Sequence, residues 1–227
     1  MNKLVLFDID KTLIESSKIK DEIVFPEAFR RVFDVEASIF EINPHGMTDQ
    51  QIIIEILKRK GIDEATILSK MDLFITVMKK LYEKHKPEDH VALLAGVKEL
   101  LEALERSDIL IGLVTGNLET IARGKLEAVG INQYFKIGGF GEDSINRIDL
   151  VEYAIRRAKE SFGFKQSDNV YLIGDAPQDI AAGKESGIKT IGVTTGIYSK
   201  EDLEKVGADF IVGNLTHLAQ ILEIIQQ

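Results

Sequence analysis

The sequence predicts an α/β protein in which a doubly wound, Rossmann-like parallel sheet carries an inserted helical cap domain. An apolar, strand-like run near the N-terminus ends in two acids, a long segment with helical periodicity follows, and helices and strands alternate after Pro87. Alternation of this kind specifies a parallel sheet that is covered on both faces. We therefore expect residues 1–14 and 87–227 to form the α/β core and residues 15–86 to form the cap.

The first expected element is a strand over Lys3 to Phe7, which runs directly into Asp8 and Asp10. At the end of a strand, residues i and i+2 point the same way, so both carboxylates can face one small volume. Two like charges held this close need a cation or a shared proton. The alternative interpretation is a solvated turn rich in aspartate.

The segment from Glu15 to Lys86 has helical rather than strand-like patterns and predicts a small helical bundle. Thr48 and Gln51 form a capping box, so a helix should begin after Thr48, with its N-terminus pointing out of the loop 43–47. We expect Thr48 and Asp49 to contact a bound ligand, and packing alone is the alternative. The apolar positions that share helix faces are Phe25, Phe29, Val32 and Phe33; Ile53, Ile54 and Leu57; and Leu73, Phe74, Val77, Met78, Leu81 and Tyr82.

After Pro87 the pattern alternates between helix and strand. Gly130 is placed to end a helix as its C′ residue, and Pro177 is placed at the first position of another. The expected helices span residues 97–104, 118–129, 147–162 and 215–225, and the expected strands span residues 109–114, 136–140, 170–173, 190–193 and 210–212.

Three polar positions follow the apolar residues of strands: Asp8, Thr115 and Asp175. In a parallel sheet these are carboxyl ends, where open α/β sheets bind ligands. Asp8 and Asp175 can bracket Mg²⁺, which prefers oxygen ligands, and Asp179 lies four residues further on, within reach of the waters of the same ion. Arrangements of this kind suit phosphoryl transfer, which depends on positioning and on neutralising negative charge.

Donors for a phosphoryl group are also present. Thr115 and the backbone N–H groups of Gly116 and Asn117 follow one strand, and Gly116 lets the backbone approach a ligand closely. Arg147 precedes a helix and can offer a fixed positive fork to the same group.

Composition and charge exclude several other functions. The 227 residues are 44% hydrophobic and 29% charged, as in ordinary soluble domains. The apolar runs are too short for a membrane span and there is no signal peptide pattern, so we expect a cytoplasmic protein with no membrane partner. The absence of cysteine excludes disulfides and thiolate metal sites. A net charge of −9 argues against nucleic acid as a partner.

The chain resembles the haloacid dehalogenase superfamily, in the phosphoglycolate-phosphatase-like branch with a helical cap inserted after the first strand. The resemblance extends over essentially the full chain. It is carried by four motifs, namely Asp8-Ile9-Asp10-Lys11-Thr12, Leu113-Val114-Thr115-Gly116-Asn117, Arg147 and Gly174-Asp175-Ala176-Pro177-Gln178-Asp179.

The resemblance implies a Mg²⁺-dependent phosphatase that forms an aspartyl phosphate on Asp8. Asp10 would be the general acid and base, with a pKa raised by burial and by Asp8. Mg²⁺ would be held by Asp8, Asp175 and the backbone carbonyl of Asp10, with support from Asp179. The catalytic set would be Asp8, Asp10, Thr115 and Arg147, and the substrate-binding set Gly116, Asn117, Thr48 and Asp49.

Two positions depart from the pattern of this family. Its third motif is more often a lysine, and Arg156, Arg157 and Lys159 are alternatives to Arg147. Lys11 stands where glycine is common between the second Asp and the Thr, which would restrict the turn.

Other functions remain as alternatives. A receiver-type phosphoacceptor would be about half this length by its fold class and would lack the helical insertion. A dehalogenase would not need Asp10, and a binding-only protein with a dead site would not need every motif. The runner-up is a phosphomutase of the β-phosphoglucomutase type, but residues 16–21 lack the histidine that this subgroup places after the first motif. We expect a small phosphorylated metabolite as substrate, and the sequence does not indicate the oligomeric state.

Overall fold

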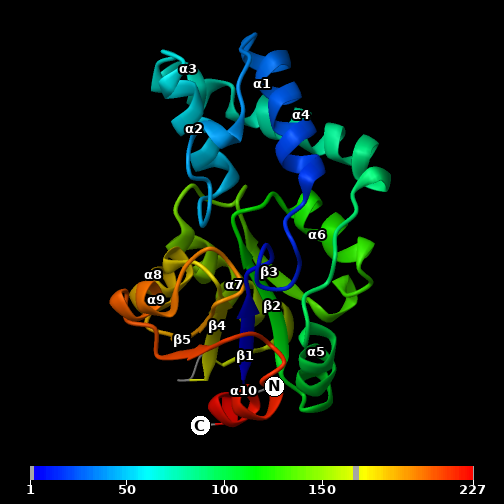
Figure 1. Cartoon of the computed structure of the whole chain (residues 1–227), viewed down its shortest axis with the longest axis vertical. Coiled ribbons are helices and arrows are strands. Elements are labelled where there is room, and N and C mark those ends of the chain that lie inside the picture. Colours follow the sequence, from blue (N-terminus) through cyan, green and yellow to red (C-terminus); the bar gives the residue numbers. More distant parts are fainter. Residues whose placement is uncertain (1–2, 166–168, 227) are drawn as a thin grey trace.

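The computed structural model describes residues 3–165 and 169–226. Over these residues one sheet of six parallel strands lies in the order β3–β2–β1–β4–β5–β6, with helices on both faces (Figure 1). The predicted doubly wound parallel sheet is confirmed. The strands are β1 (Leu4–Phe7), β2 (Leu110–Thr115), β3 (Ile137–Phe140), β4 (Val170–Gly174), β5 (Lys189–Val193) and β6 (Phe210–Val212).

Strand β1 shows how the sheet is buried on both sides. Val5 and Phe7 belong to one apolar cluster, whereas Leu4 and Leu6 belong to a second cluster on the opposite face. A strand buried on both faces reads as a continuous apolar run, which is what the sequence shows. The helices that cover the sheet are α5 (Val97–Arg106), α6 (Glu119–Ala128), α7 (Arg147–Phe162), α8 (Pro177–Glu185), α9 (Lys200–Lys205) and α10 (Leu218–Gln226).

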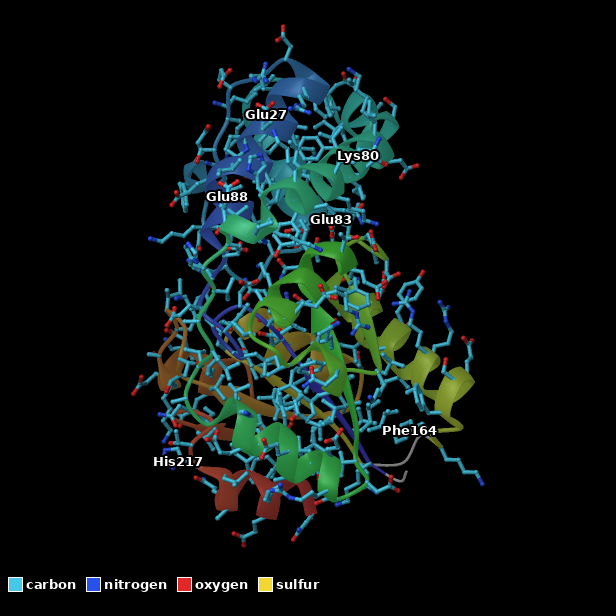
Figure 2. The ribbon with its side chains drawn as sticks, turned by 90° about the vertical axis from the view of Figure 1, so that its right-hand side faces the viewer. Glu27, Lys80, Glu83, Glu88, Phe164 and His217 are labelled. Atoms are coloured by element: carbon cyan, nitrogen blue, oxygen red, sulfur yellow. The ribbon has the colours of Figure 1, made fainter. Side chains whose placement is uncertain are left out.

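A layer of helices lies beyond the carboxyl ends of the strands, at the end of the molecule opposite α10 (Figures 1 and 2). Phe29 and Phe74 pack in its centre with ring centroids 5.0 Å apart. Leu118 and Ile121, at the start of α6, belong to the same apolar cluster, so this layer packs directly on the core. Its elements are η1 (Lys20–Val24), α1 (Phe25–Phe33), η2 (Ile39–Glu41), α2 (Asp49–Arg59), α3 (Glu64–Ser69), α4 (Met71–His85) and η3 (Lys86–Glu88).

Helix termini agree with the sequence signals where caps are strong. Thr48 and Gln51 form the predicted capping box at the start of α2. The Asn146 side chain caps α7 and leaves Arg147 as its first residue. Helices α3 and α9 were not predicted because each is only six residues long and buries a single residue, which leaves no repeating apolar stripe. The domain limits at residues 15 and 86 stay a prediction.

No helix among the described residues is both long enough and apolar enough to cross a membrane.

Candidate active site

Three buried carboxylates meet at the carboxyl edge of the sheet. Asp8 follows β1 and Asp175 follows β4, and these strands pair directly, with Phe7 opposite Ile173. The Asp8 backbone N–H continues this pairing by donating to the Ile173 carbonyl at 2.9 Å. Asp179, on the first turn of α8, brings a third carboxylate, and one oxygen from each acid lies within 4.8 Å of the other two. The predicted meeting of Asp8, Asp175 and Asp179 is therefore present in the structure.

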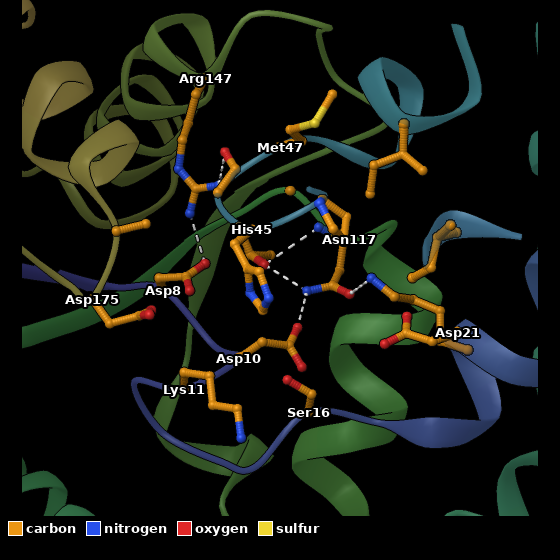
Figure 3. Close-up of a pocket in the computed structure, with 18 residues that line it drawn as sticks. Asp8, Asp10, Lys11, Ser16, Asp21, His45, Met47, Asn117, Arg147 and Asp175 are labelled. Atoms are coloured by element: carbon orange, nitrogen blue, oxygen red, sulfur yellow. Dashed lines mark hydrogen bonds and ion pairs between the residues drawn. The ribbon is translucent and has the colours of Figure 1, made fainter. Parts of the chain in front are cut away.

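Arg147 provides the cation beside these acids (Figure 3). Its Nη2 lies 2.7 Å from Asp8 Oδ1 and 2.5 Å from Asp179 Oδ1. Its Nη1 donates to the Gly46 carbonyl at 3.3 Å, which links the guanidinium to the loop before α2. Arg157 instead pairs with Asp143. Among the alternatives considered from the sequence, Arg147 is the one that reaches the strand-end acids.

The strand-end acids are only partly neutralised, since one guanidinium faces three carboxylates. Burial and the nearby charge of Asp179 raise the pKa of Asp8. Burial, followed by the charges of Asp8 and Asp179, raises the pKa of Asp175. Crowded, buried carboxylate oxygens with this unfavourable charge are suited to a hard divalent cation such as Mg²⁺. The donor set therefore fits the metal that the sequence implied.

Asp10 lies in a different electrostatic environment. Lys125 Nζ lies 2.8 Å from each of its carboxylate oxygens, and Asn117 Nδ2 donates to Oδ2 at 2.8 Å. Burial acts to raise the pKa of Asp10, but Lys125 and Lys20 outweigh it and lower the pKa to about 2. The raised pKa expected from the sequence was wrong, because that expectation counted the acid Asp8 and missed two lysines from distant segments.

Asn117 connects the second motif to Asp10. Its side-chain Nδ2 also donates to Thr115 Oγ1 at 2.8 Å, and its Oδ1 accepts from Lys20 and from Lys125, both at 2.9 Å. Lys125 is fully buried on α6. Sequence analysis missed it, although its place between Ala122 and Leu126 on the buried face of that helix was an available signal.

Thr48 and Asp49 are not among the residues that line the cavity, and the contact with substrate that the sequence predicts for them stays a prediction. Thr48 Oγ1 donates to the Ile145 carbonyl at 3.1 Å. Asp49 Oδ1 accepts from Lys20 at 3.1 Å, and Asp49 Oδ2 accepts from the Leu118 backbone N–H at 3.0 Å. Both side chains thus use their oxygens to hold the start of α2 against the core.

Two glycines allow close approach at this edge. A Cβ on Gly116 would lie 2.3 Å from the Met47 carbonyl oxygen, so glycine is needed for the cap loop to pack here. A Cβ on Gly196 would lie 1.8 Å from Asp175 Oδ2. Gly196 therefore sets the space for the Asp175 carboxylate, which also accepts from Thr12 Oγ1 at 3.2 Å. Sequence analysis did not single out Gly196, because only the fold brings its loop beside the fourth motif.

A cavity of about 90 Å³ joins these groups. The His45 ring points into it from the loop before α2 (Figure 3), although the backbone of His45 is tied to the core through its carbonyl, which accepts from Gln178 at 3.2 Å. Residues 16–21 lack histidine, but the loop before α2 places His45 in the cavity instead. The lining residues are Asp8, Asp10, Lys11, Ser16, Lys20, Asp21, Ile39, Pro44, His45, Gly46, Met47, Ile52, Thr115, Gly116, Asn117, Arg147, Asp175 and Ala176.

Comparison with known proteins identifies relatives over the whole chain. A family model described as haloacid dehalogenase-like hydrolase matches residues 5–193. The chain is 30% identical over 227 residues to a putative pyrophosphatase PpaX of Clostridium perfringens, with 98% of each covered. It is 28% identical over 128 residues to a phosphoglycolate phosphatase of Vibrio parahaemolyticus, covering 56% of this chain and 55% of that one. A solved structure, a predicted phosphatase from Clostridium acetobutylicum, superposes with a TM-score of 0.73 at 25% identity and covers 98% of this chain and 99% of its own.

Proposed function

The chain belongs to the haloacid dehalogenase-like hydrolase family, and from this premise we propose that it is a Mg²⁺-dependent phosphatase that hydrolyses a small phosphate monoester through an aspartyl phosphate on Asp8. The single observation that carries the proposal is the meeting of three buried carboxylates within 4.8 Å, beside one buried arginine and a cavity. A nucleophile, a charge-stabilising group and a bounded space are what phosphoryl transfer requires.

In the first half of the reaction, a carboxylate oxygen of Asp8 attacks phosphorus. The bond from phosphorus to the leaving oxygen breaks, and the electron pair leaves with that oxygen. Arg147 already lies 2.7 Å from Asp8 and supplies a fixed positive charge where the phosphoryl oxygens must lie. Thr115 is fully buried in the cavity wall, and its hydroxyl hydrogen can be donated to the same oxygens because Oγ1 accepts its present hydrogen bonds.

In the second half, Asp10 takes a proton from the water that attacks the phosphoenzyme, which releases phosphate and restores Asp8. The low pKa of Asp10 keeps it ionised and ready as a base. The acid role that the resemblance implies for Asp10 requires it to be protonated when the leaving group departs. Pairing with Lys125 opposes that state, so the acid role requires this pair to loosen as the substrate arrives.

Mg²⁺ held by Asp8 and Asp175, with Asp179 in support and the backbone carbonyl of Asp10, would neutralise charge on the transferred phosphoryl group. Asp179 keeps its own position independently, because its Oδ2 accepts from the Ala176 backbone N–H at 3.1 Å.

The experiment is hydrolysis of acetyl phosphate and p-nitrophenyl phosphate by the purified protein, with Mg²⁺ and with excess chelator. We expect phosphate release that depends on the metal and returns when Mg²⁺ is added back. Full activity in excess chelator would contradict the metal requirement, and no activity on either compound would contradict the phosphatase itself.

The second candidate remains a phosphomutase, and one observation favours it. His45 lines the same cavity as Asp10, so a histidine is available near the acid–base group after all. A hexose 1-phosphate supplied with a bisphosphate primer, followed by phosphorus NMR, separates the two functions. Release of inorganic phosphate supports the phosphatase, whereas conversion to the 6-phosphate without such release supports the mutase.

A further inference from the structure

The cavity has two ends with different residues. The phosphoryl end is formed by Asp8, Asp175 and Arg147 at the sheet edge. The other end, the cap end, lies past Asp10 and includes Asp21 and its neighbour Lys20 (Figure 3). Other residues of the cap that line the cavity are Ile39, His45, Met47 and Ile52. Since Asp10 serves the leaving oxygen in the proposed reaction, the leaving group must lie at this cap end.

The size of the cavity limits the leaving group. A volume of about 90 Å³ holds about six to nine water-sized groups. A phosphoryl group occupies much of that space, so a leaving group of about two carbon atoms fills what remains. The cavity is partly open to solvent, and short esters are those whose leaving group it contains.

The cations at the cap end are already occupied. Lys20 Nζ lies 3.1 Å from Asp49 Oδ1 and 2.9 Å from Asn117 Oδ1. Lys125 is committed to Asp10. Lys20 with Asp49, within the cap, and Lys125 with Asp10, within the core, thus make two neutral pairs.

Asp21 is the acid at the cap end of the cavity that neither of these pairs neutralises. It lies on η1, beside Lys20 in sequence and across Asp10 from Asp8 (Figure 3). Within residues 3–165 and 169–226 its carboxylate makes no hydrogen bond or ion pair, although it lines the cavity. Burial raises its pKa, and the charges that act on it are those of Lys20, Lys125, Asp10 and Asp49. An acceptor without a partner therefore faces the space for the leaving group.

We propose that Asp21 selects short phosphate esters whose leaving group ends in a hydrogen-bond donor, a hydroxyl or an ammonium, and rejects those that end in a second anion. This selectivity rests on the proposed function, because it assumes that the phosphoryl group occupies the Asp8 end. A carboxylate or second phosphate would face Asp21 with no free cation beside it among the described lining residues. The inference separates this chain from relatives named for pyrophosphate and phosphoglycolate.

Three esters of nearly equal size test the inference: 2-hydroxyethyl phosphate, phosphoethanolamine and phosphoglycolate, which end in hydroxyl, ammonium and carboxylate. Binding is measured by calorimetry with Mg²⁺ in an Asp8→Asn background, in which the esters stay intact. We expect each donor ester to bind at least tenfold more tightly than phosphoglycolate. Adding Asp21→Asn should reduce that preference about tenfold, the effect of removing one nearby charge.

Glu22→Gln is the matched control, since it removes the same charge from the next residue of η1, which is exposed and outside the cavity. It should change the preference less than twofold. Preference for phosphoglycolate, or an equal preference in the Asp21→Asn and Glu22→Gln proteins, would overturn the inference. Hydrolysis of acetyl phosphate by the parent protein is scored separately, so loss of the proposed chemistry is not mistaken for loss of the selectivity.

Discussion

The two groups of acids at and around the cavity, those at the strand ends and those near the second motif, have their charges balanced in opposite ways. At the strand ends, Asp8, Asp175 and Asp179 share the single guanidinium of Arg147. Around the second motif, Asp10 and Asp49 each have a lysine of their own. Accordingly the pKa of Asp8 is raised and that of Asp10 is lowered, although the two acids are only two residues apart.

This difference shows that neighbouring carboxylates in one motif can have different electrostatic environments and can therefore serve different chemical roles. A crowd of acids with excess negative charge is suited to binding a cation. An acid fixed by a lysine and an amide is suited to holding its position and staying ionised. The assignment depends on which distant segments supply the cations, and the spacing of the acids alone does not reveal it.

Replacing Lys125, the lysine that pairs with Asp10, should destabilise the protein. Lys125→Met is expected to lower the free energy of unfolding by about 2–3 kcal/mol, because it leaves Asp10 without its cation. This loss of stability is smaller than for a fully buried ion pair because the Asp10 side chain is 25% exposed. Urea unfolding measures the change in the free energy of unfolding. Lys184→Met, which removes an exposed partner of Asp209, should cost less than about 1 kcal/mol. Equal stability of the two variants would show that Lys125 does not balance Asp10.

At the strand ends, loss of one acid should weaken metal binding without unfolding the chain. Asp175→Asn is expected to reduce Mg²⁺ affinity at least tenfold, measured by calorimetry, because it removes one of the proposed direct oxygen ligands. Asp179→Asn is the matched comparison and should have the smaller effect, since Asp179 already pairs with Arg147. The reverse order would assign the ligand role to Asp179.

Stability should depend on pH in the direction set by the strand-end acids. Their folded-state pKa values lie above those of the unfolded chain, so the metal-free folded protein binds more protons. The contribution of these two acids to stability is greatest below the ordinary carboxylate pKa and falls as pH rises through the raised values. Mg²⁺ relieves this repulsion, so the gain in Tm on adding Mg²⁺ should be larger at about pH 8.5 than at about pH 6. A gain that shrinks with rising pH would contradict the charge assignment.

The smallest expected effect concerns the turn between the two groups of acids. Lys11 adopts a left-handed conformation, with φ of 65°, where a side chain is strained. Lys11→Gly should therefore raise the free energy of unfolding by about 0.5 kcal/mol, after the greater freedom of glycine in the unfolded chain is deducted. Urea unfolding resolves the sign, and a destabilised Lys11→Gly protein would mean that the lysine side chain contributes more than its backbone costs.

The sheet and its acids were predictable because backbone geometry alone places them. Apolar runs set the strand ends, and parallel pairing then brings Asp8 beside Asp175. The start of α2 after Thr48 was also predicted correctly, through the capping box. These features depend on local patterns and on one topological rule.

The partners of these acids could not be predicted in the same way. Lys125 is 115 residues from Asp10 in sequence, and Lys20 belongs to a π-helical turn, η1, for which the sequence carries no clear period. The direction of the Thr48 and Asp49 side chains depends on how closely the loop before α2 packs on Gly116, and only the folded structure reveals that contact. Long-range ion pairs and close approaches therefore account for what the sequence missed at the site.

Trapping the phosphoenzyme is the most direct test of the roles proposed for Asp8, the nucleophile, and Asp10, the general base. Asp10→Asn protein is mixed with acetyl phosphate and Mg²⁺, quenched in acid, digested and examined by mass spectrometry. We predict a phosphoryl group on the peptide that contains Asp8, persisting longer than in the parent, and none in the Asp8→Asn, Asp10→Asn double variant. A phosphoryl group that survives in the double variant, or decay in Asp10→Asn at the parent rate, would contradict these roles.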